Sequence, residues 1–316
     1  MWDAAQTVVV VNPNAAGGRV GQQWGALERE LRIRLGAVQL MLTERAGHAT
    51  ELARAAVEEG AKTVLSMGGD GTHNEVINGI MQAKPEPGAV TLGLLPAGTG
   101  GDFRRMCVSN ADALTAASAL PRAESHPIDV GSLNFHTDDG DPAQRYFINI
   151  ASFGIGGLVD RYANQSRKRL GGKATFYIAT LKALASYSPA TVRVSIDDQD
   201  MGEHVITNVM VCNGRFAGGG MMFAPEAQLG DGQFDVVFFQ HKSALNTLAM
   251  SRSIYIGTHV NSPLVTVHRG ASVKAEVITD AAAYLDIDGE APGVLPAVFH
   301  MHHHAIRLLD VRPEVV

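Results

Sequence analysis

The chain of 316 residues contains little cysteine, few aromatic side chains and no excess of positive charge. Its two cysteines, Cys107 and Cys212, lie far apart and outside any C-x-x-C pair. We therefore expect no disulfide, and we expect both thiols to be small buried side chains in a reducing compartment. The formal net charge of −6 gives the chain no overall basic surface, so no nucleic-acid partner is expected.

Long apolar segments are also absent. No apolar run approaches the ~18–20 residues that cross a bilayer, and the first residues, MWDAAQTVVVVNP, lack the three segments of a signal peptide. We expect a cytoplasmic protein whose contact with the inner membrane face is at most peripheral. Apolar residues nevertheless make up 46% of the chain, which is enough for two domains because single cores stop growing at about 250–300 residues.

The first third of the chain alternates between strand and helix patterns. Continuous apolar runs predict strands buried on both faces at residues 8–12, 38–42, 63–67 and 90–95. Apolar residues at steps of three and four predict helices at residues 20–35, 50–59 and 74–82. This order predicts a doubly wound parallel sheet that binds ligands at the carboxyl ends of its strands.

The pattern changes near Pro127, after which most segments are strand-like. The predicted strands are residues 128–135, 146–151, 191–196, 205–212, 234–239, 264–267, 273–277 and 283–287, with helices at 157–170, 174–186 and 243–257. Short polar turns between them favour an antiparallel β-sandwich or a barrel-like domain. We therefore assign residues 1–127 and 128–304 to two compact units, without a single sheet continuing through both.

The strongest local motif is Gly68-Gly69-Asp70-Gly71-Thr72, which follows a buried strand and opens a helix. Its glycines let backbone N–H groups approach a phosphate, and the helix N-terminus favours an anion. Asp70 is compatible with a bound phosphate if a divalent cation such as Mg²⁺ lies between them. The loops at residues 12–18 and 95–103 follow two other strands, so the three loops are expected to converge on one crevice.

Together these motifs resemble the catalytic domains of diacylglycerol kinases, sphingosine kinases and related bacterial lipid kinases. The resemblance covers nearly the whole chain, through VVNPNAAGG, SMGGDGTHNEVING, GLLPAGTGGDF, APEAQLGDGQFDV and LDIDGE. It implies a Rossmann-like first domain, a β-rich second domain, an active site in the cleft between them, and packing of residues 305–316 on the first domain. The implied activity is ATP-dependent phosphorylation of a hydroxyl on diacylglycerol or a sphingoid lipid taken from a membrane surface.

The resemblance also implies functional residues. Those expected around the ATP are Asn12, Pro13, Asn14, Ala15, Ala16, Thr43, Gly68, Gly69, Asp70, Gly71, Thr72, His73 and Asn74, with Thr99 near its phosphates. One position departs from the family: Gly101 precedes Asp102 where the family usually has Asn, so the orientation of Asp102 is open.

The late carboxylates belong to Leu285-Asp286-Ile287-Asp288-Gly289-Glu290. Along a strand, Asp286 and Asp288 point to one face, and the turn at Gly289 redirects Glu290. In similar kinases this motif supplies the acceptor for the hydroxyl proton, so Glu290 is the first candidate for the general base. Asp288 and Asp70 remain alternatives for the base or for a Mg²⁺ ligand.

The motif at residues 230–235 resembles the structural metal loop of the family. There Asp231 would bind Mg²⁺ with backbone carbonyls near Gln228 and Gln233, and a hairpin turn with solvated aspartates is the alternative. The histidines at positions 300 and 302–304 form a tract of a kind that can bind metal. Because no Cys or acidic ligand stands at a recognisable spacing, we expect a solvated strand end instead. The candidates for contact with anionic lipid are the basic residues Arg161, Arg167, Lys168, Arg169 and Lys173.

Two other function classes remain open. The first is an NAD kinase or phosphofructokinase-like enzyme, because those families share a similar glycine–aspartate loop. Against it stand the L-P-A-G-T loop of the fourth strand and the position of the D-G-E motif. The second is a nucleotide- or lipid-binding regulator without turnover, which would be expected to lack Asp70 or Glu290. The sequence leaves the lipid acceptor and homodimer formation open.

Overall fold

The structure, a computed structural model, describes residues 2–98, 101–108, 112–165 and 172–311. It divides the chain into two compact units. Unit 1 comprises residues 1–130 and 303–316, and unit 2 comprises residues 131–302. The boundaries expected from the sequence lie after residues 127 and 304. Unit 1 is an α/β domain, and unit 2 is mostly antiparallel β-structure.

Unit 1 is built on parallel strands in the order β2-β1-β3-β4. They are β1 (Thr7–Val11), β2 (Gln39–Leu42), β3 (Thr63–Gly68) and β4 (Thr91–Pro96). Every residue of β1 is buried, as expected for a strand covered on both faces. The register pairs Val11 with Met67 and Met67 with Leu95. The loops after β1, β3 and β4 therefore leave the sheet at the same edge.

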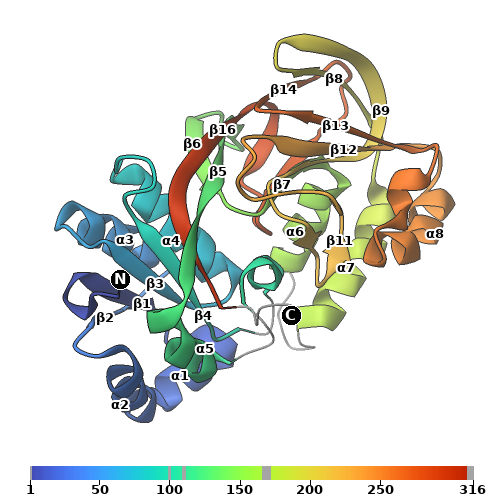
Figure 1. Cartoon of the computed structure of the whole chain (residues 1–316). Helices are drawn as coiled ribbons and strands as arrows, with labels where there is room; N and C mark the ends of the chain where they lie inside the picture. The colour runs from blue at the N-terminus through green and yellow to red at the C-terminus, as the bar shows by residue number, and fades with distance from the viewer. Residues whose placement is uncertain (1, 99–100, 109–111, 166–171, 312–316) are drawn as a thin grey trace. The chain divides into compact units, whose positions relative to one another are not determined.

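The helices of unit 1 form two packed groups, α3 with α4 and α2 with α5 (Figure 1). The predicted helix at residues 20–35 is broken at Gln23, and Gly21 before the break packs on Pro13. The helical segments are η1 (Ala4–Gln6), η2 (Ala15–Gly18), α1 (Arg19–Gln22), α2 (Trp24–Leu35), α3 (His48–Glu58), α4 (Asp70–Gln82), η3 (Phe103–Met106), α5 (Ala113–Ala119) and η4 (Leu120–Arg122).

Unit 2 contains a ring of antiparallel strands, in which β9 pairs with β7, β7 with β15, β15 with β16, β16 with β14, β14 with β8, and β8 again with β9. The pairing is thus barrel-like. The largest fully buried side chains inside unit 2 are Phe147, Phe153, Phe234, Phe238 and Phe299. The strands are β6 (Pro142–Phe147), β7 (Ile150–Gly154), β8 (Ala190–Ile196), β9 (Gln199–Cys212), β10 (Phe216–Ala217), β11 (Met221–Met222), β12 (Phe234–Gln240), β13 (Val265–Gly270), β14 (Ser272–Val277) and β15 (Tyr284–Ile287).

The helices of unit 2 are α6 (Ile155–Gln165), α7 (Gly172–Ser186), α8 (Ala244–Tyr255) and the short η6 (Thr258–Asn261). The single strand expected at residues 146–151 is instead two strands, β6 and β7. The carboxylate of Asp288 accepts hydrogen bonds from the N–H groups of Ile148 and Ile150, and these bonds stabilise the break between β6 and β7. Among the described residues, no helix is long and apolar enough to cross a membrane.

Two long strands, β5 (Glu124–Thr137) and β16 (Gly293–Asp310), run through both units. The start of β16 belongs to the ring of unit 2, and its end pairs in parallel with β4, with Arg307 opposite Thr91. Figure 1 shows β16 in red beside β5. Strand pairing is therefore continuous along the chain, and the expectation that no sheet continues through both units is wrong.

Candidate functional site

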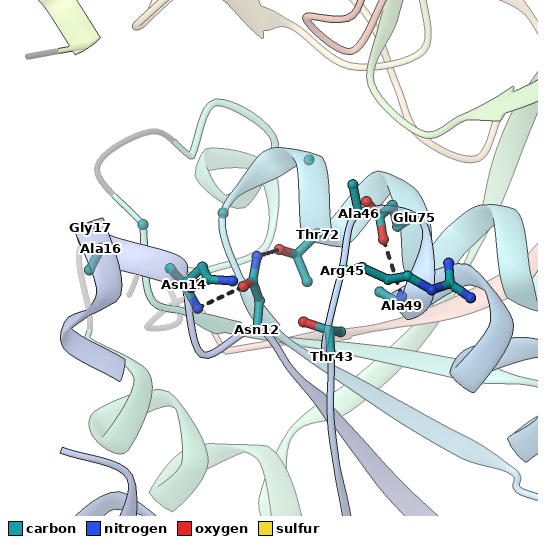
Figure 2. A pocket seen from close by; sticks show the side chains of 14 residues that line it. Asn12, Asn14, Ala16, Gly17, Thr43, Arg45, Ala46, Ala49, Thr72 and Glu75 are labelled. Carbon is teal, nitrogen blue, oxygen red and sulfur yellow. Dashed lines mark hydrogen bonds between the residues drawn. The ribbon is translucent and has the colours of Figure 1, made fainter. Parts of the chain in front are cut away.

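A cavity of about 470 Å³ lies in unit 1 at the edge where the strands of the parallel sheet end (Figure 2). It is lined by residues of the loops after β1, β2, β3 and β4 and of the N-terminal parts of helices α3 and α4. These residues are Asn12, Asn14, Ala15, Ala16, Gly17, Thr43, Arg45, Ala46, Ala49, Gly69, Gly71, Thr72, Glu75 and Gly98. Eight of the thirteen residues expected around a nucleotide, apart from Thr99, are thus at the cavity.

Asn12 joins two of the loops around this cavity. Its side-chain amide donates to Thr72 Oγ1 over 2.9 Å, and its Oδ1 accepts from the N–H of Asn14 over 2.9 Å (Figure 2). The backbone N–H of Asn12 also donates to the carbonyl of Met67 at the end of β3. The loop after β1 is therefore held against the start of α4.

The loop after β1 turns sharply along the cavity. Ala16, Gly17 and Gly18 have φ values of 54°, 70° and 86°. Successive residues in unusual turn conformations can direct backbone N–H groups into a concave surface that suits an anion. Alanine rarely adopts a positive φ, so Ala16 is a strained position at the cavity wall.

The loops after β3 and β4 approach each other through glycine backbones. A Cβ placed on Gly98 would lie 2.9 Å from Gly69 Cα, so a larger residue does not fit there. Gly69 also occupies the N-cap of α4 and has no side chain that could cap the first N–H groups of the helix. The first N–H groups of a helix and its dipole favour a phosphate.

The two carboxylate oxygens of Asp70, the first residue of α4, differ in their hydrogen bonding. Its Oδ2 accepts from the N–H of Gly101 over 2.7 Å. Its Oδ1 is buried, and no described residue hydrogen-bonds to it. An ionised oxygen buried without a partner is costly, and a carboxylate oxygen is a ligand that Mg²⁺ prefers. The geometry of Asp70 therefore fits a divalent cation.

The other expected nucleotide residues lie in different surroundings. His73 is buried, and its Nδ1 lies 2.7 Å from Ser66 Oγ. Burial and the charge of Arg104 lower the pKa of His73 to about 4, so the ring is neutral at pH 7. Asn74 is buried and hydrogen-bonded to Asn78. Pro13 and Gly68 do not line the cavity, and Thr99 lies outside the described residues.

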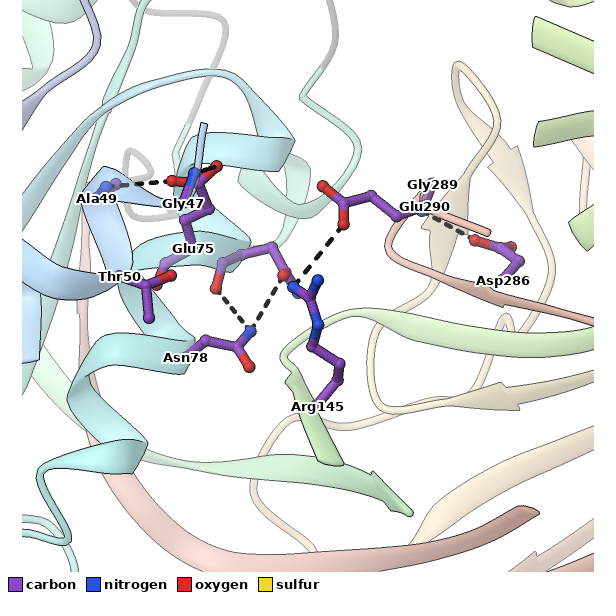
Figure 3. A network of polar contacts seen from close by, with 10 residues as sticks. Gly47, Ala49, Thr50, Glu75, Asn78, Arg145, Asp286, Gly289 and Glu290 are labelled. Carbon is purple, nitrogen blue, oxygen red and sulfur yellow. Dashed lines mark hydrogen bonds and ion pairs between the residues drawn. The ribbon is translucent and has the colours of Figure 1, made fainter. Parts of the chain in front are cut away.

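Sequence reasoning missed Arg45 and Glu75, which both line the cavity. Glu75 accepts from the N–H groups of Gly47 and Ala49 and thereby fixes the loop that begins α3 (Figure 3). Arg45 pairs with Glu51 at 2.7 Å and supplies a cation at the cavity. The only hint of Arg45 in the sequence was its position, two residues after Thr43, which was expected at the nucleotide.

In unit 2, the Asp286–Glu290 motif forms a tight hairpin turn after β15. Ile287 and Glu290 exchange two backbone hydrogen bonds, at 2.8 and 3.0 Å, around Asp288 and Gly289. The two central residues have φ values of 48° and 89°. Two positive φ values are typical of a type I′ turn, whose twist matches that of the flanking strands.

The three carboxylates of this motif have different environments. Asp288 accepts from the backbone N–H groups of Ile148 and Ile150, so it is a structural acceptor and a poor candidate for the base. Glu290 is 49% exposed and lies 3.8 Å from Arg145 (Figure 3). Asp286 accepts from Ser152 Oγ and from the N–H of Gly289. Glu290 is therefore the accessible carboxylate of the turn.

The loop expected to bind a structural metal contains an ion pair instead. Asp231 Oδ2 pairs with Arg269 Nη2, and Asp231 Oδ1 accepts from the N–H of Gln233 over 3.1 Å. A guanidinium next to the carboxylate disfavours a second cation there. This arrangement does not fit the expected cation site, and the side chain of Gln228 is exposed.

The histidine tract of β16 is less solvated than expected. His303 Nδ1 lies 2.9 Å from Oδ1 of the buried Asp129, and the N–H of His304 donates to the same oxygen. His302 contacts Ser132 Oγ through its ring. The expectation of a solvated strand end is therefore correct only in part, because the tract is bonded to β5.

The basic segment proposed for lipid contact is described only in part. Arg161 pairs with Asp138 and lies over the ring of Tyr284, with 4.4 Å between Cζ and the ring centre. The other basic residues expected to contact lipid, Arg167, Lys168, Arg169 and Lys173, lie outside the described side chains.

Two family models match the chain. The model described as "Diacylglycerol kinase catalytic domain" matches residues 6–133. The model described as "YegS C-terminal NAD kinase beta sandwich-like domain" matches residues 149–310. The two matches fall largely on the α/β unit and on the β-rich unit, respectively.

Curated relatives and solved structures agree with these matches. The chain is 30% identical over 269 residues to the diacylglycerol kinase of Bacillus subtilis, covering 84% of each chain. It is 30% identical over 259 residues to a diacylglycerol kinase of Staphylococcus aureus, covering 81% of this chain and 77% of the relative. The crystal structure of a diacylglycerol kinase from Bacillus anthracis shares the fold, with a TM-score of 0.70, 20% identity and 98% of each chain covered. The chain belongs to the diacylglycerol kinase catalytic-domain family and is a kinase of that family.

Proposed function

We propose that this kinase transfers the γ-phosphoryl group of ATP to a hydroxyl of diacylglycerol or a related sphingoid lipid. The observation that carries the proposal is the buried Oδ1 of Asp70, to which no described residue hydrogen-bonds and which lies at the N-terminus of α4 beside a cavity of glycine backbones. A site for a metal nucleotide requires N–H groups that bind the phosphates and a carboxylate oxygen that binds the cation. The N-terminus of α4 supplies the first, and Asp70 supplies the second.

The cavity residues have separate roles in this proposal. Gly69 and Gly98 allow the phosphates to approach the backbone closely. The hydrogen bond from Asn12 to Thr72 holds the loop after β1 against the start of α4. Arg45 adds positive charge. When bound, Mg²⁺ would neutralise charge on the phosphates, and Asp70 is the side chain that would hold it.

Glu290 is the proposed acceptor of the lipid hydroxyl proton. A carboxylate base must be ionised and accessible to the substrate. Glu290 is half-exposed, whereas Asp288 is engaged by two backbone N–H groups and Asp286 by Ser152 and Gly289. The type I′ turn holds Glu290 on a rigid hairpin, which favours a fixed position for the base.

A lipid acceptor must be reached at a membrane surface. Helix α7 exposes Tyr177, Ile178 and Leu181, which are 62%, 38% and 42% exposed. Residues spaced by three or four positions share one helix face, so Tyr177 and Ile178 lie on the same side as Leu181. Apolar and aromatic side chains in this arrangement suit shallow contact with lipid, and we assign peripheral membrane contact to this face.

The acceptor assignment is tested by incubating the full chain with [γ-³²P]ATP, Mg²⁺ and one acceptor at a time. The acceptors are diacylglycerol, sphingosine and monoacylglycerol in mixed micelles, and NAD⁺ in buffer. The proposal predicts a labelled lipid that is absent with Asp70→Ala. Labelled NADP⁺ without labelled lipid would instead support an NAD kinase-like activity, for which the family match of unit 2 is the favouring observation. Binding of ATP without transfer to any acceptor would support a regulator.

A further inference from the structure

The histidine tract of β16 contacts a buried carboxylate on β5. Asp129 has an exposure of 0%, and its Oδ1 lies 2.9 Å from His303 Nδ1. The backbone N–H of His304 donates to the same oxygen over 2.7 Å. Asp129, His303 and His304 all belong to unit 1, and none of the three lines the cavity at the ends of the parallel strands.

The backbone of β16 brings two neighbouring imidazole rings together. Successive side chains of a regular strand point to opposite faces of the sheet, so adjacent rings are normally far apart. His304 instead has a φ of 51°, which interrupts the regular strand. The rings of His303 and His304 stack, with 3.6 Å between their centres and 27° between their planes. A positive φ is uncommon for residues other than glycine, and such conformations gather at functional sites.

Each of the three residues offers an atom that binds transition metals. One carboxylate oxygen and one nitrogen from each ring lie within 4.8 Å of one another. Zn²⁺ binds imidazole nitrogen and carboxylate oxygen at about 2.0–2.2 Å, so the ligand atoms of a tetrahedral site are about 3.3–3.6 Å apart. The side chain of His303 is 54% exposed, so its ring can rotate to close the remaining difference. The same exposure gives an ion a path from solvent.

The partners of Asp129 distinguish this group from the Asp231 loop. Asp231 pairs with the guanidinium of Arg269, and that fixed positive charge disfavours a second cation. An imidazole is neutral once it is deprotonated, and its nitrogen is then a metal ligand. A divalent ion can therefore take the place of the proton between His303 Nδ1 and the carboxylate of Asp129, and binding would release that proton.

We propose that Asp129, His303 and His304 bind a divalent transition-metal ion of the zinc type, with solvent completing its coordination. Two nitrogen ligands favour Zn²⁺ over Mg²⁺, which prefers oxygen ligands. The site thus differs in chemistry from the Mg²⁺ site that we assign to Asp70. Strand β5 pairs with β16 (Figure 1), so the bound ion links these two strands and stabilises the folded chain. The inference does not depend on the proposed function.

Competition with a chromophoric zinc chelator tests the site in the full chain. The protein is freed of metal with EDTA, and ZnCl₂ is then added in the presence of excess Mg²⁺. The parent should bind one equivalent of Zn²⁺. His303→Gln and His304→Asn each remove one imidazole and should weaken binding at least about 10–100-fold, the loss typical for a residue that merely orients a ligand. Asparagine tolerates a positive φ, so His304→Asn should keep the fold.

Three further variants define the ligands. His300→Gln is the matched control, because His300 belongs to the same tract but is exposed and lies outside the group. This variant and Asp70→Asn should keep the affinity of the parent. Asp129→Asn keeps the size of the side chain but removes the charged ligand, so it should lose affinity as the histidine variants do. Parental affinity in Asp129→Asn, or in both His303→Gln and His304→Asn, would mean adventitious binding of Zn²⁺ and would overturn the proposal.

Thermal unfolding gives a second readout without a chelator in the assay. Zn²⁺ that binds the folded chain should raise the melting temperature of the parent, and EDTA should reverse the rise. His304→Asn should melt near the parent without metal and should not respond to Zn²⁺. An equal rise in both proteins would contradict the site. A parent that labels no lipid would refute the proposed function and would leave both zinc measurements unaffected.

Discussion

Asn12 and Thr72 lie 60 positions apart in the chain, and a 2.9 Å hydrogen bond joins the side-chain amide of the first to the hydroxyl of the second. The bond connects the loop after β1 to the first turn of α4. Two walls of the cavity are thereby held in one arrangement. This cross-link leads to the first prediction.

Asn12→Ala removes the donor to Thr72 and the acceptor for the N–H of Asn14. Each hydrogen bond contributes about 0.5–1.5 kcal/mol, so ATP affinity should fall about tenfold. Isothermal titration with Mg-ATP measures the effect. Thr72→Ser keeps the accepting hydroxyl and serves as the matched control, with affinity close to that of the parent. Unchanged affinity in Asn12→Ala would mean that the cross-link does not shape the nucleotide site.

A comparison of Gly98→Ala with Gly71→Ala tests whether the loops after β3 and β4 must approach each other closely. A Cβ on Gly98 would lie 2.9 Å from Gly69 Cα, whereas a Cβ on Gly71 meets nothing within 4 Å. Overpacking typically costs about 1–3 kcal/mol, so Gly98→Ala should lower the melting temperature. Gly71→Ala replaces a helical glycine and should not lower it. Equal melting temperatures for the two variants would show that the two loops can separate without cost.

His73 gives a prediction for pH. Its folded pKa of about 4 lies below the unfolded value of 6.5, so the unfolded chain takes up a proton first as pH falls. Neutral His73 therefore contributes about 3 kcal/mol to the free energy of unfolding. This contribution is fully present above pH 6.5 and is lost as the pH falls towards 4. Denaturant unfolding at pH 7 and pH 5 should show a steeper loss for the parent than for His73→Gln. His136→Gln, at an exposed position, is the control and should follow the parent.

Asp70→Asn tests the cation assignment. The amide keeps the size of the side chain but removes the charge from the oxygen that no described residue satisfies. Mg²⁺ should then strengthen ATP binding much less than it does in the parent, while binding of ATP without Mg²⁺ should change little. Thermal shifts with ATP, with and without Mg²⁺, provide the measurement. A variant that keeps the full response to Mg²⁺ would assign the cation to another residue.

The sequence predicted the parts of the site that depend on backbone conformation. The run of valines in β1 and the glycines at positions 68, 69 and 71 mark a buried strand and a phosphate-type loop without any tertiary information. The parallel register then follows from the order of elements, and it brings Asn12 and Gly69 to one edge of the sheet. These features were predictable because buried strands and close backbone approach at the strand ends restrict residue choice locally.

The remaining features depend on packing that no local pattern encodes. Asp160 is one acid on an amphipathic helix, and its burial depends on the packing of α6 against other elements of unit 2, among them β15. The ring of strands in unit 2 and the continuous pairing through β16 arise from long-range pairing. Likewise, Asp231 was expected to bind a metal, but Arg269, which lies 38 positions later in the chain on β13, pairs with its carboxylate.

The central claim is that Glu290 accepts the proton of a lipid hydroxyl while unit 1 holds the metal nucleotide. The most direct test is the single-turnover rate of phosphoryl transfer from ATP to diacylglycerol in the parent and in Glu290→Gln, with the Kd for Mg-ATP measured in parallel. A positioned base contributes about 10²–10⁴-fold, so the rate should fall by that factor while the Kd stays within about threefold. A parental rate in Glu290→Gln, or a rate loss explained by weaker ATP binding, would contradict the account.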